Sequence, residues 1–289
     1  MAAVTAGVLA GCGGEETAGD SEKADRTDHT AYAEARAREV ADAWQKSKAA
    51  DVWNRGYYPM ADLTEAPERG FRNKADEHAF ATGNFELRGD LSDGSQKSGK
   101  VTWRTGESLE LPLMEPRKAY EALDRSEAEG TSLIVTGVRL GAMVHQTSRG
   151  PATVPAWLFT VDGYEAPLKR VAVSPSALPT PPIRPARDVS GSELTPLNGI
   201  AEVAQDGRSL TVLASHGACD DGPAVRTLET RTTVVLSASV LGAEDGPCSG
   251  ESNVTSVNVK LDRSVYGRIV LDAFTGRPVQ YAPRVVGRS

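Results

Sequence analysis

The sequence has few of the residues from which catalytic and metal sites are most often built. Its 289 residues include three cysteines and four histidines, and aromatic residues make up 6%. Four histidines leave few options for a histidine base, and no two cysteines have the close C-x-x-C spacing of zinc sites. A Gly-x-Ser-x-Gly nucleophile motif and a glycine-rich phosphate loop are missing too. We therefore expect no catalytic residue, no bound metal and no cofactor.

Positive charge and long apolar runs are also scarce. There are 32 Lys and Arg residues against 39 Asp and Glu, which gives a formal charge of -7. Because nucleic-acid affinity rests largely on basic side chains that neutralise phosphates, nucleic acid is not an expected partner. Beyond the first twelve residues, no apolar run approaches the roughly 20 residues of a membrane-spanning helix. Any attachment to a membrane must therefore come from the N-terminus.

What the sequence does have is a short apolar segment at its start. Residues 1–12, MAAVTAGVLAGC, are small, apolar and uncharged, and polar residues follow at once. The order Leu9, Ala10, Gly11, Cys12 resembles the lipobox of bacterial lipoproteins. That resemblance implies a diacylglyceryl group on Cys12, which becomes the N-terminus after cleavage, so the lipid bilayer is the first expected partner. The predicted location is the outer face of the bacterial cytoplasmic membrane.

One feature departs from this pattern. A signal peptide normally begins with Lys or Arg, and none precedes Cys12. We therefore expect residues 1–12 to be a truncated signal peptide, whose true start lies upstream or whose basic end has been lost. The alternative is an ordinary free cysteine in a small-residue tail. Residues 13–28 are acidic and polar, which predicts a disordered tether.

Cys219 and Cys248 remain as an even pair, as expected of a structural disulfide in an oxidising compartment. Residues 224–242 predict two strands around a turn near Thr230 and Arg231, and such a hairpin brings the residues outside its open end together. Closing a loop of about 30 residues stabilises by about 3 to 4 kcal/mol on the chain-entropy model.

Metal binding near these cysteines is the alternative. His216 could join the two thiolates, but the close spacing of zinc ligands is missing. Asp220, Asp221 and Asp245 could offer oxygen ligands to Ca²⁺, but they do not follow the ordered calcium-loop pattern. We therefore favour solvated loop acids.

The pattern of elements predicts an α+β, β-rich fold, with an N-terminal α+β domain followed by a small all-β, sandwich-like domain. The first domain is expected at 29–173, a Pro-rich linker with six prolines at 174–196, and the second domain at 197–286. Helices are expected from about Asp28 to 50 and at 115–130. Strands are expected at 78–91, 98–106, 107–113, 131–147 and 154–174 in the first domain, the first three as a meander, and at 199–205, 209–215, 224–230, 232–241, 253–261 and 267–274 in the second.

One place could hold a small anion. His145 ends a predicted strand, and Arg149 lies in the connection that follows. Both side chains can donate hydrogen bonds to an oxyanion, so the two could line a ligand cleft. A plain surface turn is the alternative that we favour.

Beyond the lipobox, the chain resembles a broad set of actinobacterial secreted lipoproteins with no established activity. The segments that carry the likeness are 147–161, 266–279 and the cysteine surroundings at 217–222 and 246–250. The resemblance implies an envelope location and a β-rich body.

These patterns favour a membrane-anchored cell-envelope lipoprotein that is a binding or structural module and not an enzyme. Its expected partners are the bilayer and an envelope protein or wall component. A cell-surface hydrolase that uses acidic residues or His145, and a transporter-associated binding lipoprotein, are the alternatives.

Overall fold

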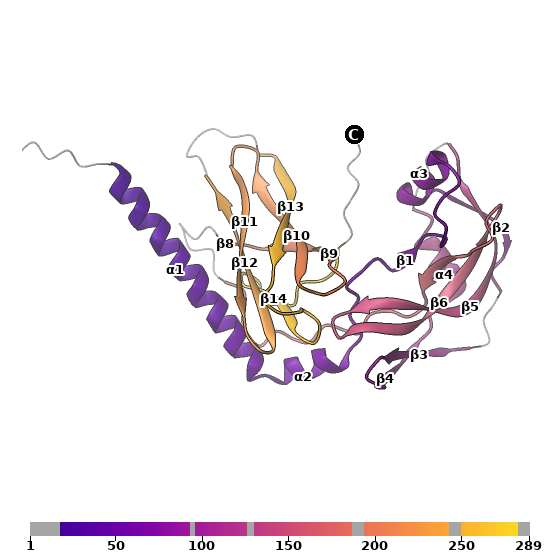
Figure 1. The fold of residues 1–289 in the computed structure, drawn as a ribbon, viewed down its shortest axis with the longest axis horizontal. Helices are drawn as coiled ribbons and strands as arrows, with labels where there is room; N and C mark the ends of the chain where they lie inside the picture. The colour runs from indigo at the N-terminus through magenta and orange to yellow at the C-terminus, as the bar shows by residue number, and fades with distance from the viewer. Residues whose placement is uncertain (1–17, 93–95, 126–129, 187–193, 243–249, 283–289) are drawn as a thin grey trace, which may run out of the picture.

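The structure is a computed structural model that describes residues 18–92, 96–125, 130–186, 194–242 and 250–282, with side chains described from Thr30 onward. In the described part of the chain, fourteen strands and four helices are present, and strands predominate. The predicted α+β, β-rich fold class is confirmed. Figure 1 shows two groups of strands, one formed by β1 to β7 and one by β8 to β14, with helix α1 along the outer side of the second group.

The N-terminal helix is longer than the sequence predicted. Helix α1 spans Ala18–Gln45, so it includes most of the segment expected to be a disordered tether. Once the later turns are held by packing, each further residue adds one backbone hydrogen bond at little cost, and no proline interrupts the extension. The expected single helix also divides, because Ser47 caps a separate helix α2 (Lys48–Arg55) by accepting a hydrogen bond from the Ala50 N–H.

Helix α1 packs against the C-terminal strands and not against the first group, to which the sequence assigned it. The indole N–H of Trp44, which is fully buried, donates to the carbonyl oxygen of Gly276 at 2.8 Å. Arg36 Nε donates to the carbonyl of Ala273 at 3.0 Å, and its Nη2 donates to that of Arg184 at 2.6 Å. The helix is therefore fixed by directional bonds as well as by its apolar face, which packs with the core that contains Leu271.

The first group of strands is a seven-stranded sheet built around one long hairpin. Strands β5 (Leu133–Thr147) and β6 (Gly150–Val161) pair along almost their whole length. Strand β6 is buried on both faces from Val154 to Phe159, so it is the centre of the sheet. The other strands are β1 (Thr64–Glu65), β2 (Phe85–Asp90), β3 (Ser98–Trp103), β4 (Ser108–Pro112) and β7 (Leu168–Val171).

Three local predictions in this sheet were wrong. Residues 78–82 belong to helix α3 (Lys74–Thr82), which Asn73 caps at its start and the left-handed Gly83 ends, and not to a strand. Strand β2 pairs in parallel with β5, so β2, β3 and β4 do not form a meander. A turn after Val161 divides the expected strand 154–174 into β6 and β7.

Helix α4 (Pro116–Glu121) is shorter than the helix predicted for 115–130. The backbone N–H of Arg125 donates to the carbonyl of Gly83 at 2.9 Å instead of to a helical carbonyl. This tertiary bond competes with the helix, and no local pattern in the sequence announces it.

The second group of strands forms two packed sheets, as a sandwich requires. One sheet has the order β13 (Ser252–Lys260), β10 (Ser209–Gly217), β9 (Leu197–Val203). The other contains β11 (Gly222–Glu229), β12 (Thr233–Leu241), β14 (Ile269–Asp272) and β8 (Leu194–Thr195). Strands β11 and β12 form the predicted hairpin, with Thr230 in its turn bonded to Thr233. The domain boundaries themselves stay a prediction. No helix in the described part of the chain is both long enough and apolar enough to cross a membrane.

The docking of α1 gives a direct test. Trp44→Ala removes a fully buried side chain and its bond to Gly276, so we expect the free energy of unfolding to fall by about 3 to 5 kcal/mol. Gln45→Ala changes an exposed neighbour on the same helix and should alter it by less than about 0.5 kcal/mol. Urea unfolding followed by circular dichroism measures both. Equal effects of the two substitutions would contradict the docking.

Candidate functional site

The end of the β5–β6 hairpin joins the two groups of strands. Its turn residue Ser148 accepts a hydrogen bond from the Gly267 N–H at 2.9 Å, and its own N–H donates to the carbonyl of Tyr58 at 2.9 Å. The Met60 N–H donates to the carbonyl of Gln146 at 2.9 Å. We call residues 57–60, 145–150 and 266–267 the junction. It contains both predicted ligand-cleft residues and parts of two segments singled out in the sequence.

His145 lies inside the junction and is only 2% exposed. Its Nδ1 lies 3.1 Å from the hydroxyl of Tyr57, and its Nε2 lies 3.1 Å from the carbonyl oxygen of Asp62. A carbonyl oxygen only accepts, so Nε2 carries the proton and Nδ1 accepts from Tyr57. Both ring nitrogens are therefore engaged within the chain.

Burial governs the titration of these groups. It lowers the pKa of His145 below its ordinary value, although the carbonyl of Asp62 and the nearby carboxylates of Glu65 and Asp62 act in the opposite direction. Burial also raises the pKa of the Tyr57 hydroxyl above its ordinary range. Burial and the neighbouring Asp62 together raise the pKa of Tyr281 to about 12. At neutral pH the junction therefore holds a neutral imidazole beside the neutral hydroxyl of Tyr57.

Arg149 is engaged in a different way. Its guanidinium lies 3.7 Å from the centre of the Trp103 ring and forms an ion pair with Glu107. A cation over an indole face is attracted by the ring quadrupole. The side chain is only 16% exposed, so both interactions cover it. The charge of Arg149 is thus directed toward the β3–β4 hairpin.

Thr147 connects these parts. Its Oγ1 accepts from the indole N–H of Trp103 at 3.0 Å and from the backbone N–H of Arg149 at 3.1 Å. The same hydroxyl donates to the carbonyl of Gly150 at 2.6 Å. Gly150 has a φ of 91°, a left-handed conformation that favours glycine. The hydroxyl therefore closes the tight turn and fixes Trp103 under Arg149.

Ser148 is a contrast to Thr147. It is 5% exposed, and its Oγ has no hydrogen-bond partner among the residues that the structure describes. A buried hydroxyl without a partner costs about 1 to 3 kcal/mol. What holds Ser148 in the junction is thus its backbone, through the bonds to Tyr58 and Gly267.

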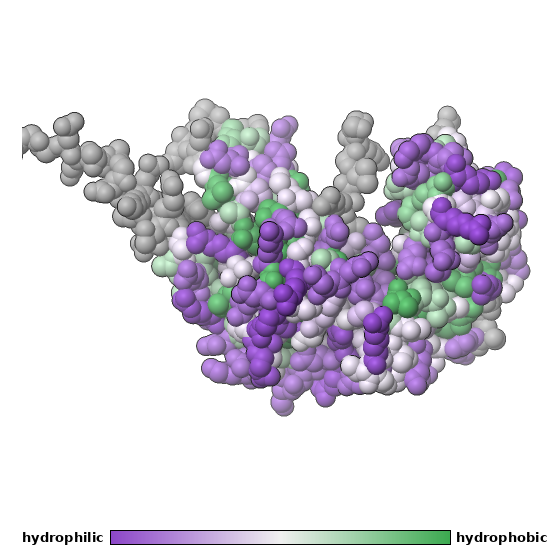
Figure 2. All heavy atoms as spheres, in the orientation of Figure 1, coloured by the Kyte–Doolittle hydropathy of each residue, from purple (hydrophilic) through white to green (hydrophobic). Residues whose placement is uncertain are grey.

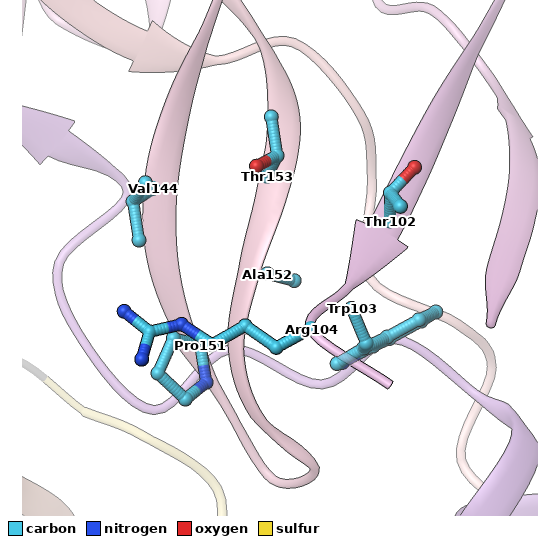
Figure 3. Close-up of a pocket in the computed structure, with 7 residues that line it drawn as sticks. All are labelled: Thr102, Trp103, Arg104, Val144, Pro151, Ala152 and Thr153. Carbon is cyan, nitrogen blue, oxygen red and sulfur yellow. The ribbon is translucent and has the colours of Figure 1, made fainter. Parts of the chain in front are cut away.

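A shallow hollow lies beside the junction on the solvent side of the sheet. It has a volume of about 120 Å³, and Figure 3 shows Thr153 between Val144 and Thr102 on adjacent strands, with Arg104 and Pro151 nearby. Pockets that enclose small-molecule ligands are usually about 300 to 1,000 Å³. Neither His145 nor Arg149 lines this hollow. The two predicted cleft residues lie at the same hairpin end, but their polar atoms point to partners within the chain.

The surface does not offer one large apolar patch on the side that Figure 2 draws, where apolar residues form separate groups among polar ones. The large apolar side chains that are exposed come from separate elements: Val52, Val144, Leu178, Leu241 and Val254. Isolated apolar side chains are normal on a soluble surface. No group of three or more His, Cys, Asp or Glu residues in the described ranges is arranged to hold a metal ion.

Of the three cysteines, Cys219 alone lies among the described residues. Cys12 and Cys248 lie outside the described residues, so the lipid site and the disulfide stay predictions. Cys219 lies just after β10 and just before β11. Two ladders end near it, since Gly217 pairs with Ser252 and Gly222 pairs with Leu241. Both ladders therefore bring the chain on either side of residue 248 back toward Cys219.

Three residues that belong to the junction or contact it were not singled out from the sequence as site residues: Tyr57, Trp103 and Thr147. Tyr57 lies in a segment without periodic apolar residues, and Trp103 lies within the strand expected at 98–106. The signal that was available is the threonine before a Ser-Arg-Gly turn. Comparisons of the chain with models of protein families, with curated proteins and with solved structures found no match.

The burial of His145 predicts a pH dependence. Its pKa in the folded protein lies below the value of about 6.5 in an unfolded chain. The unfolded state therefore takes up a proton first as the pH falls through about 6.5, and the folded state loses stability by up to about 1.4 kcal/mol per pH unit until the folded pKa is reached.

Urea unfolding at about pH 7.5 and about pH 5.5 measures this loss. His145→Gln should remove it, whereas His78→Gln, at an exposed histidine of α3, should leave it in place. The prediction is wrong if the two variants show the same loss between these pH values.

The two neighbouring hydroxyls predict opposite results. Thr147→Val leaves the indole N–H of Trp103 and the Arg149 N–H without their acceptor, so we expect a loss of about 2 to 4 kcal/mol in the free energy of unfolding. Ser148→Ala removes a hydroxyl that bonds to nothing described, so we expect no loss or a gain of about 1 kcal/mol. Thermal and urea unfolding of both variants decide this, and a large loss in Ser148→Ala would show that its hydroxyl has a partner.

Proposed function

We propose that the chain is a lipid-anchored protein of the bacterial cell envelope, held to the outer face of the cytoplasmic membrane by Cys12, and that its folded part is a binding or structural module. An envelope protein or a wall component is the partner class that we propose. The lipobox-like order Leu9, Ala10, Gly11, Cys12 supports the anchor.

The non-enzymatic part of the proposal rests on one observation: the side chains of His145 and Arg149 are bonded to partners within the chain. A histidine that serves as a general base must reach the proton that it removes. His145 is buried, with Tyr57 and the Asp62 carbonyl on its two ring nitrogens. Arg149 lies on Trp103 and pairs with Glu107, so its charge already has a partner within the chain. These side chains stabilise the fold, and that role accounts for them without a substrate.

The docking of α1 supports a mechanical role for the N-terminal segment. Helix α1 begins six residues after Cys12 and is about 40 Å long at 1.5 Å per residue. Its later turns are bonded to the carbonyls of Gly276 and Ala273 through Trp44 and Arg36. A lipid on Cys12 would therefore be coupled to the C-terminal strands by a stiff helix.

The expected disulfide fits the same location. The β10–β13 and β11–β12 ladders pair Ser252 with Gly217 and Leu241 with Gly222, and Gly217 and Gly222 lie on either side of Cys219 in the chain. Disulfides persist in oxidising compartments, which the outer face of the membrane adjoins. We propose that this pair is bonded in the mature protein.

The anchor is tested by a single substitution. Cys12→Ala removes the sulfur that accepts the lipid, so we expect the protein to move from the membrane fraction into the medium. Cys219→Ala is the matched control, because it removes a cysteine without removing the anchor. Immunoblots of the two fractions measure the distribution, and membrane retention of Cys12→Ala would contradict the proposal.

The non-enzymatic part has its own test. The purified protein should not turn over acyl, peptide or glycosidic model substrates. Turnover that is lost in His145→Gln, while His78→Gln keeps it, would instead establish a hydrolase. The two tests are independent, so failure of one leaves the other intact.

A further inference from the structure

Strand β13 forms one edge of the sandwich, and it lacks the usual protection of an edge strand. It pairs with β10 at nine successive positions without a register shift. Residues 252–259 contain no charge, no proline and no glycine, and residues 252–256 are all exposed. Val254 is 55% exposed. A long, regular and neutral edge of this kind is a template for pairing with another strand.

Three other edges in the described part of the structure are protected. Strand β4 carries Glu110 and ends at Pro112. Strand β11 carries Pro223 and Arg226. Strand β9 has two register shifts, and its Ile200 bonds to the segment 280–282. Charge, proline, bulges and covering segments all oppose edge-to-edge pairing, so β13 differs from these three edges.

The hydrogen-bond pattern shows which groups of β13 are available. The Leu261 N–H donates to the carbonyl of Arg208, which continues the register of the ladder. Bonded and non-bonded pairs alternate in an antiparallel ladder, so the odd-numbered residues of β13 bond to β10. The carbonyl of Ser209, opposite Lys260, points away from β13 and accepts from the Ala204 N–H. This agrees with Ser209 and Lys260 being a non-bonded pair. The N–H and C=O groups of the even-numbered residues therefore point away from β10.

We propose that β13 pairs antiparallel with β13 of a second copy of this chain, on a two-fold axis at Ser256. A two-fold axis must pass between a residue and its own mate. Ser256 is the midpoint of Ser252–Lys260, so this axis alone pairs the strand over its full length. Ser256 is also one of the residues whose backbone groups point outward. An axis at Ser256 therefore fits both its central place in the strand and the outward direction of its backbone groups.

The charges at the strand ends also fit a second copy. Glu251 precedes the strand, and Lys260 ends it. Antiparallel pairing brings Lys260 of each copy beside the Glu251 end of the other, whereas parallel pairing would place like charges together. The exposed Val254 lies opposite Asn258 of the second copy. The result is one continuous sheet across the dimer, a partner that the proposed function does not supply.

Charge reversal at the axis tests the register. In Ser256→Lys two ammonium groups lie opposite each other, and in Ser256→Glu two carboxylates do, so each variant should weaken the dimer about tenfold. An equimolar mixture of the two variants should restore a heterodimer. Ser108→Lys, at an exposed serine on the protected edge β4, is the matched control and should leave the dimer unchanged.

Sedimentation equilibrium of the full chain over a wide concentration range measures the wild type, the three variants and the mixture, and circular dichroism checks that each is folded. A wild-type chain that stays monomeric at every concentration would overturn the proposal and leave β13 free for a peptide of another protein. A dimer that tolerates Ser256→Lys and Ser256→Glu alike would also overturn it.

Discussion

The pairing of β5 with β6 is the constraint on which the rest of the structure depends. Their ladder runs from Val135 with Val161 to Thr147 with Gly150, and it places alternate side chains of β6 on two different cores. Trp157 and Phe159 face the helices α3 and α4, whereas Val154 and Ala156 face Tyr57 and Met143. A shift of this register by one residue would exchange the two sets and remove both cores.

The same hairpin explains why the two groups of strands meet where they do. Its turn is closed by Thr147 and presents the backbone of Ser148 to Tyr58 on one side and to Gly267 on the other. At the opposite side of the second group, α1 is fixed by Trp44 and Arg36. His145 and Arg149, which the sequence suggested for an anion site, thus stabilise the fold through contacts within the chain. The proposed membrane anchor and a stiff helix α1 bonded to the second group of strands fit the proposed binding or structural role.

The sequence predicted those features that depend on local pattern. Alternation and a turn at Thr230 were sufficient for the β11–β12 hairpin, and the sheet-rich class followed from many such segments. Nonlocal features were missed. The parallel partner of β2, the contact of α1 with β12 and the early end of α4 depend on residues distant in the chain. His145 shows the same limit, because the side chain that bonds to its Nδ1, Tyr57, lies 88 residues earlier. Helix α3 could have been predicted from its caps, Asn73 and Gly83, since these are local signals.

The central claim is that the mature protein is attached to a membrane through Cys12. The most direct measurement is the mass of the N-terminal peptide of the protein isolated from the membranes of its own cells. The account predicts a peptide that begins at Cys12 and carries a diacylglyceryl group on the sulfur. A peptide that continues through Leu9, Ala10 and Gly11 into an unmodified Cys12 would contradict it.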